Sequence, residues 1–299
     1  MNNNKKTFKS GFCSIVGMAN VGKSTLLNQI AGQKIAIISN KPQTTRNKIL
    51  AIYNTDEEQI VFTDTPGIHT PHTKLGEVMV KTANESMNEM DVIIFVVDAS
   101  TSINEMEYKI GKDIAKSKIP CILVLNKIDT MRKDELLPVI ADYSGICEFE
   151  SIVPISAKTG DGIEILLNNI RQYIKEGPKY FYDDMVTDQP EKQIAAEIIR
   201  EKLLWLLDKE IPHGVAIEIE KMQEKANVTA ISASIYCEKN SHKGIIIGKN
   251  GEMLKKIGTM ARVDIEKMLN KKVYLELWVK VRTDWRNNNA LIKNFGFEN

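Results

Sequence analysis

The sequence lacks the features of a secreted or membrane-spanning protein. Its four cysteines are scattered, with no close pair at metal-ligand spacing. Cys13 and Cys121 lie in apolar runs, where a buried thiol is the simplest interpretation. The first residues lack the long apolar core of a signal peptide, and the longest apolar run, Val92–Val97, is far too short to span a bilayer. We therefore expect a reduced, cytoplasmic protein.

A strong overall charge is also missing, because the net charge is only +1 over 299 residues. The charge is unevenly divided along the chain. Residues 1–199 hold 22 Lys and Arg against 26 Asp and Glu, a net of −4, and residues 200–299 hold 18 against 13, a net of +5. The C-terminal third is thus the better partner for a polyanion. A chain of this length has room for two domains.

A glycine-bearing loop between an apolar run and a helical stretch is the first strong signal. It fits the pattern G-x-x-x-x-G-K-S/T and consists of Gly17, Met18, Ala19, Asn20, Val21, Gly22, Lys23, Ser24 and Thr25. Its glycines let successive N–H groups converge on a phosphate, and the following helix adds the positive end of its dipole. In this pattern Lys23 reaches the β- and γ-phosphates and the Ser24 hydroxyl ligates Mg²⁺. An ordinary turn before a helix also fits a lone match.

Short apolar runs alternate with helical stretches from residue 11 to about residue 175. This alternation predicts an α/β fold with a mostly parallel sheet and helices on both faces. The candidate strands are Gly11–Gly17, Ile49–Asn54, Gln59–Thr63, Asp91–Asp98, Ile119–Asn126 and Ser151–Ile155. The high apolar content of the fourth and fifth predicts central strands that are buried on both faces.

Two loops of this region suit the γ-phosphate and its metal ion. One follows a strand and consists of Asp64, Thr65, Pro66, Gly67 and Ile68. Asp64 would hold Mg²⁺ through a water, and the Gly67 N–H would sense the γ-phosphate, although Asp before Pro-Gly is also common turn chemistry. The other is the polar segment around Thr44 and Thr45, which is either a solvated connection or a mobile loop. In the second case Thr45, chosen over Thr44, would give Mg²⁺ a hydroxyl.

Two later strand ends suit a guanine base. The first is followed by Asn126, Lys127, Ile128 and Asp129, and the second by Ser156, Ala157 and Lys158. The Asp129 carboxylate would accept hydrogen bonds from the guanine N1–H and its exocyclic amine, a pattern that adenine reverses. The backbone after Ser156 would meet the guanine O6. All these loops fall on the sheet edge where an open α/β fold binds ligand, so the sequence predicts a guanine-nucleotide site.

The last hundred residues predict an α+β domain of a different kind. An amphipathic helix at Gln193–Leu207 precedes strands at Val215–Lys221 and Val228–Glu238, and a helix at Glu252–Leu269 precedes a strand at Val273–Val281. We expect a GTPase domain at residues 1–176, a linker at 177–192 and an RNA-binding domain at 193–299. The Tyr180–Tyr182 cluster of the linker is a candidate for packing between the domains.

A GxxG tetrapeptide lies between two helical stretches of this second domain. Its N–H groups and Lys249 would clamp sugar-phosphate, and Ile245–Ile247 would take unstacked bases, whereas a bare GxxG is also a common helix-joining turn. The net positive charge favours RNA. The candidate RNA-binding residues are Ile247, Gly248, Lys249, Asn250, Gly251 and Lys255.

Taken together, these motifs resemble the Era-type branch of the translation-factor class of GTPases, and the C-terminal part resembles a type II KH domain. The resemblance implies a GTPase that binds small-subunit rRNA near its 3′ end and assists small-subunit assembly. It also implies that the protein can associate peripherally with the inner membrane. We further expect a monomer. A membrane-associated signalling GTPase with incidental RNA binding is the alternative, and a non-catalytic RNA-binding adaptor stays open. A tRNA-modification GTPase would need further domains.

The catalytic residues implied by the resemblance are Lys23, Thr45 and Asn20. Ile68 stands where Ras-like GTPases place a catalytic Gln, and an apolar side chain cannot orient water. In related GTPases with this substitution, the asparagine at the position of Asn20 helps to hold a monovalent cation, for which K⁺ is a candidate. Met18 and Ala19 depart from the usual basic residue and proline, without expected harm. Mg²⁺ is the expected cofactor, held by Ser24, Thr45 and, through water, Asp64.

Overall fold

The computed structural model describes residues 7–41, 44–64, 66–67, 71, 73–85 and 90–297. The chain divides into two compact units. We call Met1–Ala36, Thr45–Thr70 and Met79–Asp188 the N-terminal unit, and Ile37–Thr44, Pro71–Val78 and Gln189–Asn299 the C-terminal unit. Two short segments from the first third of the chain thus belong to the C-terminal unit, which a division at one linker does not anticipate.

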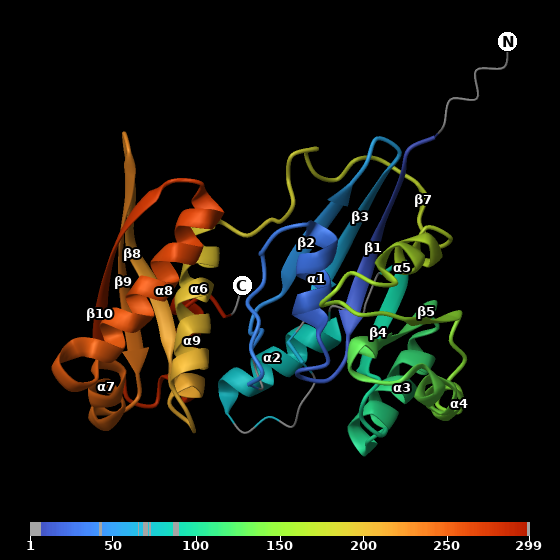
Figure 1. Ribbon diagram of the computed structural model, residues 1–299, viewed down its shortest axis with the longest axis horizontal. Coiled ribbons are helices and arrows are strands. Elements are labelled where there is room, and N and C mark those ends of the chain that lie inside the picture. Colours follow the sequence, from blue (N-terminus) through green and yellow to red (C-terminus); the bar gives the residue numbers. More distant parts are fainter. Residues whose placement is uncertain are drawn as a thin grey trace, which may run out of the picture. The chain divides into compact units, whose positions relative to one another are not determined.

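The N-terminal unit is built on a mostly parallel sheet (Figure 1). Its strands are β1 (Lys9–Val16), β2 (Ile49–Asn54), β3 (Glu58–Asp64), β4 (Val92–Asp98), β5 (Cys121–Asn126), β6 (Ser151–Pro154) and β7 (Lys175–Glu176). Their order is β2-β3-β1-β4-β5-β6, with β2 antiparallel to β3 and the short β7 antiparallel to β1. The predicted α/β fold is confirmed, and β7 is an addition that the sequence did not reveal.

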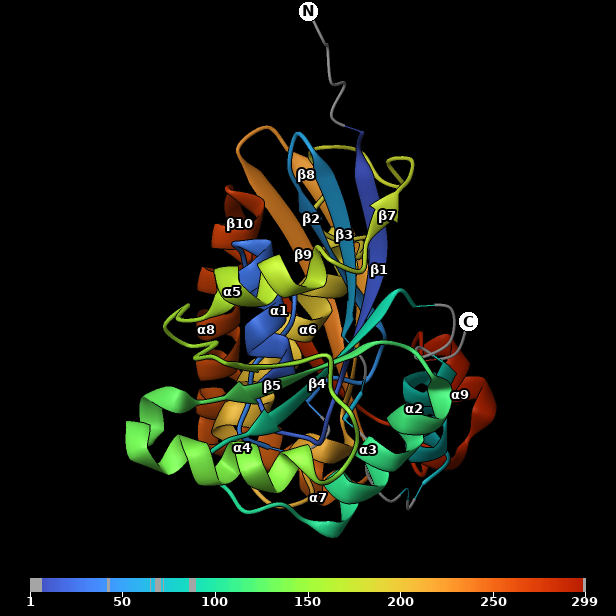
Figure 2. The same ribbon diagram turned by 90° about the vertical axis from the view of Figure 1, so that its right-hand side faces the viewer.

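Helices cover both faces of this sheet, as Figure 2 shows from the side. They are α1 (Lys23–Ala31), α3 (Glu105–Ser117), α4 (Leu136–Ser144) and α5 (Ile163–Ile170). A further helix, α2 (Lys74–Glu85), begins in the C-terminal unit and ends in the N-terminal unit. Successive residues of β4 point to opposite faces. Ile94 therefore joins the core under α1 and α5, whereas Phe95 joins the core under α3 and α4. The expectation of central strands buried on both faces is confirmed.

The C-terminal unit places helices beside a small mixed sheet. Its elements are α6 (Glu191–Leu206), β8 (Ala216–Lys225), β9 (Val228–Cys237), α7 (Asn240–Ile247), α8 (Glu252–Leu269), β10 (Lys272–Val281) and α9 (Asn289–Asn294). The strand order is β10-β9-β8, with β9 parallel to β10 and antiparallel to β8. Apolar residues of α6, α8 and the three strands share one core. A single 3₁₀ turn, Lys249–Gly251, joins α7 to α8.

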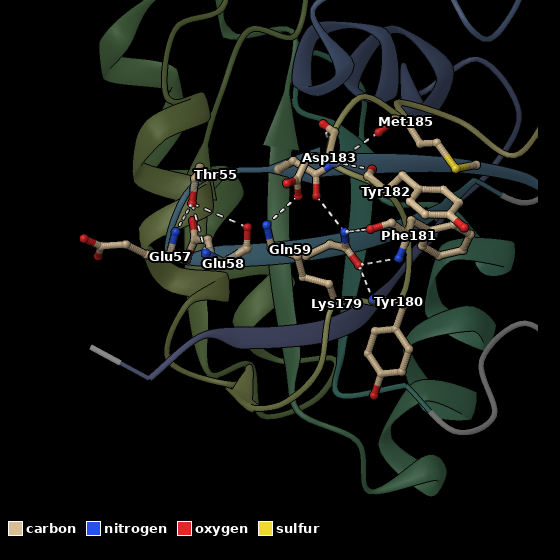
Figure 3. A network of polar contacts seen from close by, with 11 residues as sticks. Thr55, Glu57, Glu58, Gln59, Lys179, Tyr180, Phe181, Tyr182, Asp183 and Met185 are labelled. Atoms are coloured by element: carbon tan, nitrogen blue, oxygen red, sulfur yellow. Dashed lines mark hydrogen bonds and ion pairs between the residues drawn. The ribbon is translucent and has the colours of Figure 1, made fainter. Parts of the chain in front are cut away.

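The first half of the expected linker lies along the N-terminal unit (Figure 3). Gln59 is fully buried, and its side-chain oxygen accepts hydrogen bonds from the backbone N–H groups of Tyr180 and Phe181. Its amide nitrogen donates to the Phe181 carbonyl at 3.0 Å. The Tyr180 ring lies 4.8 Å from that of Phe12 on β1. The buried amide therefore fixes the backbone of Tyr180 and Phe181 on the N-terminal unit, whereas the Tyr182 side chain is 80% exposed.

Among the residues that the structure describes, no helix is long and apolar enough to cross a membrane.

Candidate nucleotide site and RNA groove

The glycine-bearing loop connects β1 to α1. Asn126, at the end of β5, joins this loop to the loop that follows β6. The Asn126 side chain donates to the Val21 carbonyl at 2.8 Å and accepts from the Ala157 N–H at 2.9 Å. Gly22 passes directly over this amide with φ of +102°, and an added Cβ would come within 2.2 Å of the Asn126 nitrogen. Asn126 thus joins two nucleotide loops, a structural role that the sequence did not distinguish from contact with the base.

Lys23 is buried inside the loop and donates to two of its carbonyl groups. Its ammonium nitrogen lies 3.0 Å from the Gly17 oxygen and 2.7 Å from the Met18 oxygen. Burial lowers the pKa of Lys23 to about 8, and the nearby Asp64 carboxylate opposes this shift. A buried cation with only carbonyl partners is poorly compensated, so an entering phosphate oxygen would stabilise it.

Three oxygen-bearing side chains meet beside Lys23. The Ser24 hydroxyl lies 2.8 Å from the Thr45 hydroxyl and donates to the Asp64 carboxylate at 2.8 Å. The Thr45 hydroxyl is 3.5 Å from the same carboxylate oxygen. Thr44 points elsewhere, because its hydroxyl donates to the Lys41 carbonyl at 2.6 Å. Hard oxygen donors around a buried carboxylate suit Mg²⁺.

The two base-recognition loops meet at Asp129. The Ser156 hydroxyl donates to the Asp129 carboxylate at 2.7 Å and so fixes its orientation. Lys127 forms an ion pair of 2.6 Å with Asp98 at the end of β4. Burial raises the pKa of Asp98, but hydrogen bonds from Lys127 and Ser100 outweigh burial and leave it below its usual value. The Ile128 N–H donates to the Ile155 carbonyl, which joins the two loops again.

The remaining candidates fall into three groups. Met18 packs against both cores of the N-terminal unit, so its apolar side chain has a structural place. Ala19, Pro66 and Gly67 lie in the described loops and Thr25 in the first turn of α1, while Asn20 and Lys158 are exposed, Asn20 with φ of 68°. Thr65 and Ile68 lie outside the described residues.

The GxxG turn depends on glycine at its first position. Gly248 has φ of +74°, and an added Cβ would lie 2.9 Å from the Met253 backbone nitrogen. Gly251 also has a positive φ, of +78°, but faces open space. Asn250 adopts a left-handed conformation between them, and Lys249 is exposed. The turn therefore presents backbone and a cation to solvent at the start of α8.

A groove of about 480 Å³ runs from this turn between α8 and β10. It is lined by Gly251, Leu254, Lys255, Gly258, Thr259, Arg262, Val273, Tyr274, Leu275 and Leu277. Its floor is aliphatic, its rim carries two cations of α8, and Tyr274 is 63% exposed. Such a surface offers stacking contacts together with phosphate contacts.

The tetrapeptide by itself does not indicate most of the residues that line this groove. Lys255, Thr259 and Arg262 recur at helical spacing, which was a usable signal for a common face of α8. The isoleucine run does not form the expected wall. Ile246 is fully buried and Ile245 is 51% exposed, because successive helical residues point in directions about 100° apart. Ile247 packs against the core.

Comparison with known proteins agrees with this geometry. Residues 12–127 match a family described as "50S ribosome-binding GTPase", and residues 210–286 match one described as "KH domain". A protein of Clostridioides difficile, "GTPase Era", is 56% identical over 293 residues, covering 97% of this chain and 99% of its own. The "GTPase Era" of Ruminiclostridium cellulolyticum is 53% identical, covering 98% of both chains. The chain belongs to the Era family of GTPases.

Solved Era structures extend the agreement to the whole fold. A variant of Aquifex aeolicus Era bound to GDP and AlF₄⁻ matches with a TM-score of 0.94 and 41% identity, covering 98% of this chain and 100% of that one. Era in complex with MgGDPNP and nucleotides 1506–1542 of 16S ribosomal RNA matches with the same score, identity and coverage. The resemblance seen in the motifs is thereby confirmed, and the chain is a GTPase of the Era family.

Proposed function

We propose that this chain is a GTP-hydrolysing switch that binds 16S rRNA near its 3′ end and assists assembly of the small ribosomal subunit. One observation carries the proposal. A single chain holds a full set of nucleotide loops and a cation-rimmed GxxG groove, and its fold matches an Era that holds MgGDPNP and 16S rRNA nucleotides 1506–1542. The structure and the matches do not favour a membrane-signalling role.

In this proposal the phosphate loop and Lys23 bind the β- and γ-phosphates. The Lys23 ammonium would exchange its contacts with Gly17 and Met18 for phosphate oxygens. Asp129, oriented by Ser156, would accept the two guanine donors. Asn126 holds both loops at a fixed separation, so it would act by positioning.

Ser24 and Thr45 would ligate Mg²⁺ directly, and Asp64 would hold it through water. Their three oxygens already converge beside Lys23. When bound, the ion would neutralise charge on the β- and γ-phosphate oxygens. The MgGDPNP in the related Era supports this assignment.

Hydrolysis would proceed by in-line attack of water on the γ-phosphorus. Lys23 would stabilise the charge that develops on the phosphate oxygens, and Thr45 would hold the loop closed over them. Ile68 follows Gly67 in the sequence, so no glutamine orients the water there. A monovalent cation such as K⁺, held by the exposed Asn20 side chain, would supply further positive charge. Intrinsic turnover should therefore be slow and dependent on this cation.

The RNA would enter the groove beside Gly248–Gly251. Lys249 and Lys255, joined by Arg262, would contact phosphates, and the aliphatic floor with Tyr274 would receive unstacked bases. A domain division at residues 1–176, 177–192 and 193–299, a cytoplasmic location, peripheral inner-membrane association and a monomeric state remain predictions.

The proposal is tested by measuring RNA affinity in both nucleotide states. A fluorescent single-stranded RNA of the 16S 3′ terminus is titrated with protein saturated with Mg²⁺ and either GDPNP or GDP. We expect tighter binding with GDPNP and loss of binding in Gly248→Asp/Gly251→Asp. Equal affinity in both states would instead indicate an RNA-binding adaptor without a switch.

A further inference from the structure

The turn that carries Asp129 begins at a residue with an unfavourable backbone. Lys127 has φ of 69° and ψ of 31°, in the left-handed region that residues with a side chain rarely adopt. It directly precedes the 3₁₀ turn Ile128–Thr130. Its carbonyl accepts hydrogen bonds from the N–H and from the hydroxyl of Thr130, at 2.9 Å and 2.8 Å. These bonds close the turn, so the place of Asp129 depends on how Lys127 leaves the sheet.

Asp98 holds Lys127 from the neighbouring strand. β4 and β5 are parallel, and Asp98 lies opposite Asn126, the last residue of β5. The Ala99 N–H donates to the Asn126 carbonyl at 2.9 Å, so the pairing continues to the point where Lys127 leaves the sheet. There the Lys127 ammonium forms its ion pair with Asp98. The pair therefore links the end of β4 to the first residue of the loop that follows β5.

The Asp98 carboxylate is itself held in place. One oxygen accepts from the N–H and from the hydroxyl of Ser100, at 3.1 Å and 2.6 Å, and the other accepts from Lys127 at 2.6 Å. The Asp98 side chain is 15% exposed and that of Lys127 is 35% exposed. A pair that is partly shielded from water, and whose carboxylate is already oriented, holds its geometry better than an exposed surface pair. Ser100 thus fixes Asp98, and Asp98 fixes Lys127.

The two loops involved also border an open pocket. Its volume is about 330 Å³, and it is lined by Ser100 of the first loop, by Thr130 and Met131 of the second, and by residues of α4. Where a loop borders such a space, fewer packing contacts fix its backbone. Specific contacts such as the pair between Asp98 and Lys127 then matter more for the position of the turn.

We propose that Asp98 and Ser100 are positioning residues for guanine recognition. Asp98, oriented by Ser100, holds Lys127 in its left-handed conformation. This places Asp129 where its carboxylate meets the guanine N1–H and exocyclic amine. Asp129 is then fixed from two directions, because Ser156 binds its carboxylate directly and Asp98 holds the start of its turn. The proposal rests on the proposed role of Asp129 in base recognition and extends that function to two residues outside the nucleotide motifs.

The test removes each contact in turn. Asp98→Asn keeps the shape of the side chain but removes the charge that pairs with Lys127, and Ser100→Ala removes one hydrogen bond to the same carboxylate. Asp113→Asn is the matched control, because Asp113 pairs with Lys116 at 2.7 Å on the exposed surface of α3. Thermal unfolding of each variant is recorded first, so that only folded proteins are compared.

Affinities for GDP and for inosine diphosphate, whose base lacks the exocyclic amine, are measured at saturating Mg²⁺ in the full chain. The wild type should prefer GDP by about tenfold or more, because inosine diphosphate loses one hydrogen bond to a charged carboxylate. We expect Asp98→Asn to reduce this preference at least about threefold, and Ser100→Ala to reduce it less. Asp113→Asn should keep the wild-type preference. A general loss of stability would weaken the binding of both nucleotides equally and leave the preference unchanged.

A second measurement tests the route through Lys127. Because Asp98 acts through this residue, the double variant Asp98→Asn/Lys127→Met should bind GDP no more weakly than Lys127→Met alone. Full additivity of the two substitutions would place Asp98 on a separate route and overturn the proposal.

The preference for GDP separates the two ways in which the proposal can fail. If the wild type prefers GDP, and Asp98→Asn and Ser100→Ala keep that preference, the two residues do not position Asp129 and the proposed function stands. If the wild type binds GDP and inosine diphosphate equally, the role of Asp129 in the proposed function fails as well.

Discussion

The nucleotide site and the RNA groove are built by opposite means. In the first, polar side chains such as Lys23, Asp64 and Asn126 are at most 6% exposed and are held by hydrogen bonds from several loops. In the second, a glycine-dependent turn and exposed side chains of α8 and β10 border an open groove. Removing one partner of a buried polar group leaves the other partner unpaired, which costs much binding free energy. Each solvent-exposed phosphate contact, in contrast, adds only a small part of the affinity for RNA. Substitutions should therefore act sharply at the first site and by degrees at the second.

The largest effect should come from Asp129→Asn. The amide cannot accept both guanine donors but complements xanthine, so the preference between the two bases should shift by roughly 10³ or more. Competition binding with GDP and XDP measures the shift. Asp134→Asn, at an exposed carboxylate of the next turn, is the control and should not change the preference. Retained preference for GDP in Asp129→Asn would remove this residue from base recognition.

The next largest effect should come from Lys23→Ala. The variant loses charge-assisted contacts with two phosphates, each worth about 1.5–3 kcal/mol, so GTP affinity should fall at least about a hundredfold. Fluorescent-nucleotide titration measures it, with Lys109→Ala on α3 as the surface control. RNA affinity without nucleotide should stay the same, since the groove lies on other elements. Unchanged GTP affinity would refute the phosphate-loop assignment.

These two residues belong to the part of the site that the sequence could predict. A phosphate loop, a strand-end Asp and a base-recognition Asp are each set by local spacing, and the parallel sheet brings strand ends to one edge. Local spacing does not decide between Thr44 and Thr45, and it is the structure that brings the Thr45 hydroxyl to Ser24. The order of elements around the GxxG turn likewise follows from periodicity.

Other features depend on contacts between distant residues and leave no local pattern. Arg262 and Tyr274 face one groove only because α8 returns along β10. Gln59 fixes the first half of the linker from more than a hundred residues away. Composition in these stretches is ordinary, so only the folded chain reveals them.

A smaller effect should follow from exchanging K⁺ for Na⁺. If Asn20 helps to hold K⁺ at the phosphates, turnover at saturating Mg²⁺ should be at least about tenfold lower in Na⁺, a barrier difference of about 1.4 kcal/mol. Steady-state phosphate release in each salt measures this, and Asn20→Ala should abolish the difference. Equal turnover of the wild type in both salts would exclude the cation role.

The smallest effect should come from Lys255→Ala in the groove. One phosphate contact fewer should reduce the slope of log affinity against log salt by about 0.7 for single-stranded RNA, with a loss of only a few fold in affinity. Anisotropy titrations over a range of KCl concentrations measure the slope. Lys109→Ala again serves as the control. A loss of RNA affinity of a hundredfold or more would contradict the difference between the two sites, because the groove would then be as sensitive to one substitution as the nucleotide site.

The most direct test of the whole account is to identify the RNA that the protein holds in cells. RNA crosslinked to the wild type and to Gly248→Asp/Gly251→Asp is sequenced, and GDPNP affinity of the double variant confirms that its nucleotide site is intact. The account predicts a peak at the 3′ end of small-subunit rRNA that the double variant loses. Scattered RNA, or a peak that survives both substitutions, would contradict it.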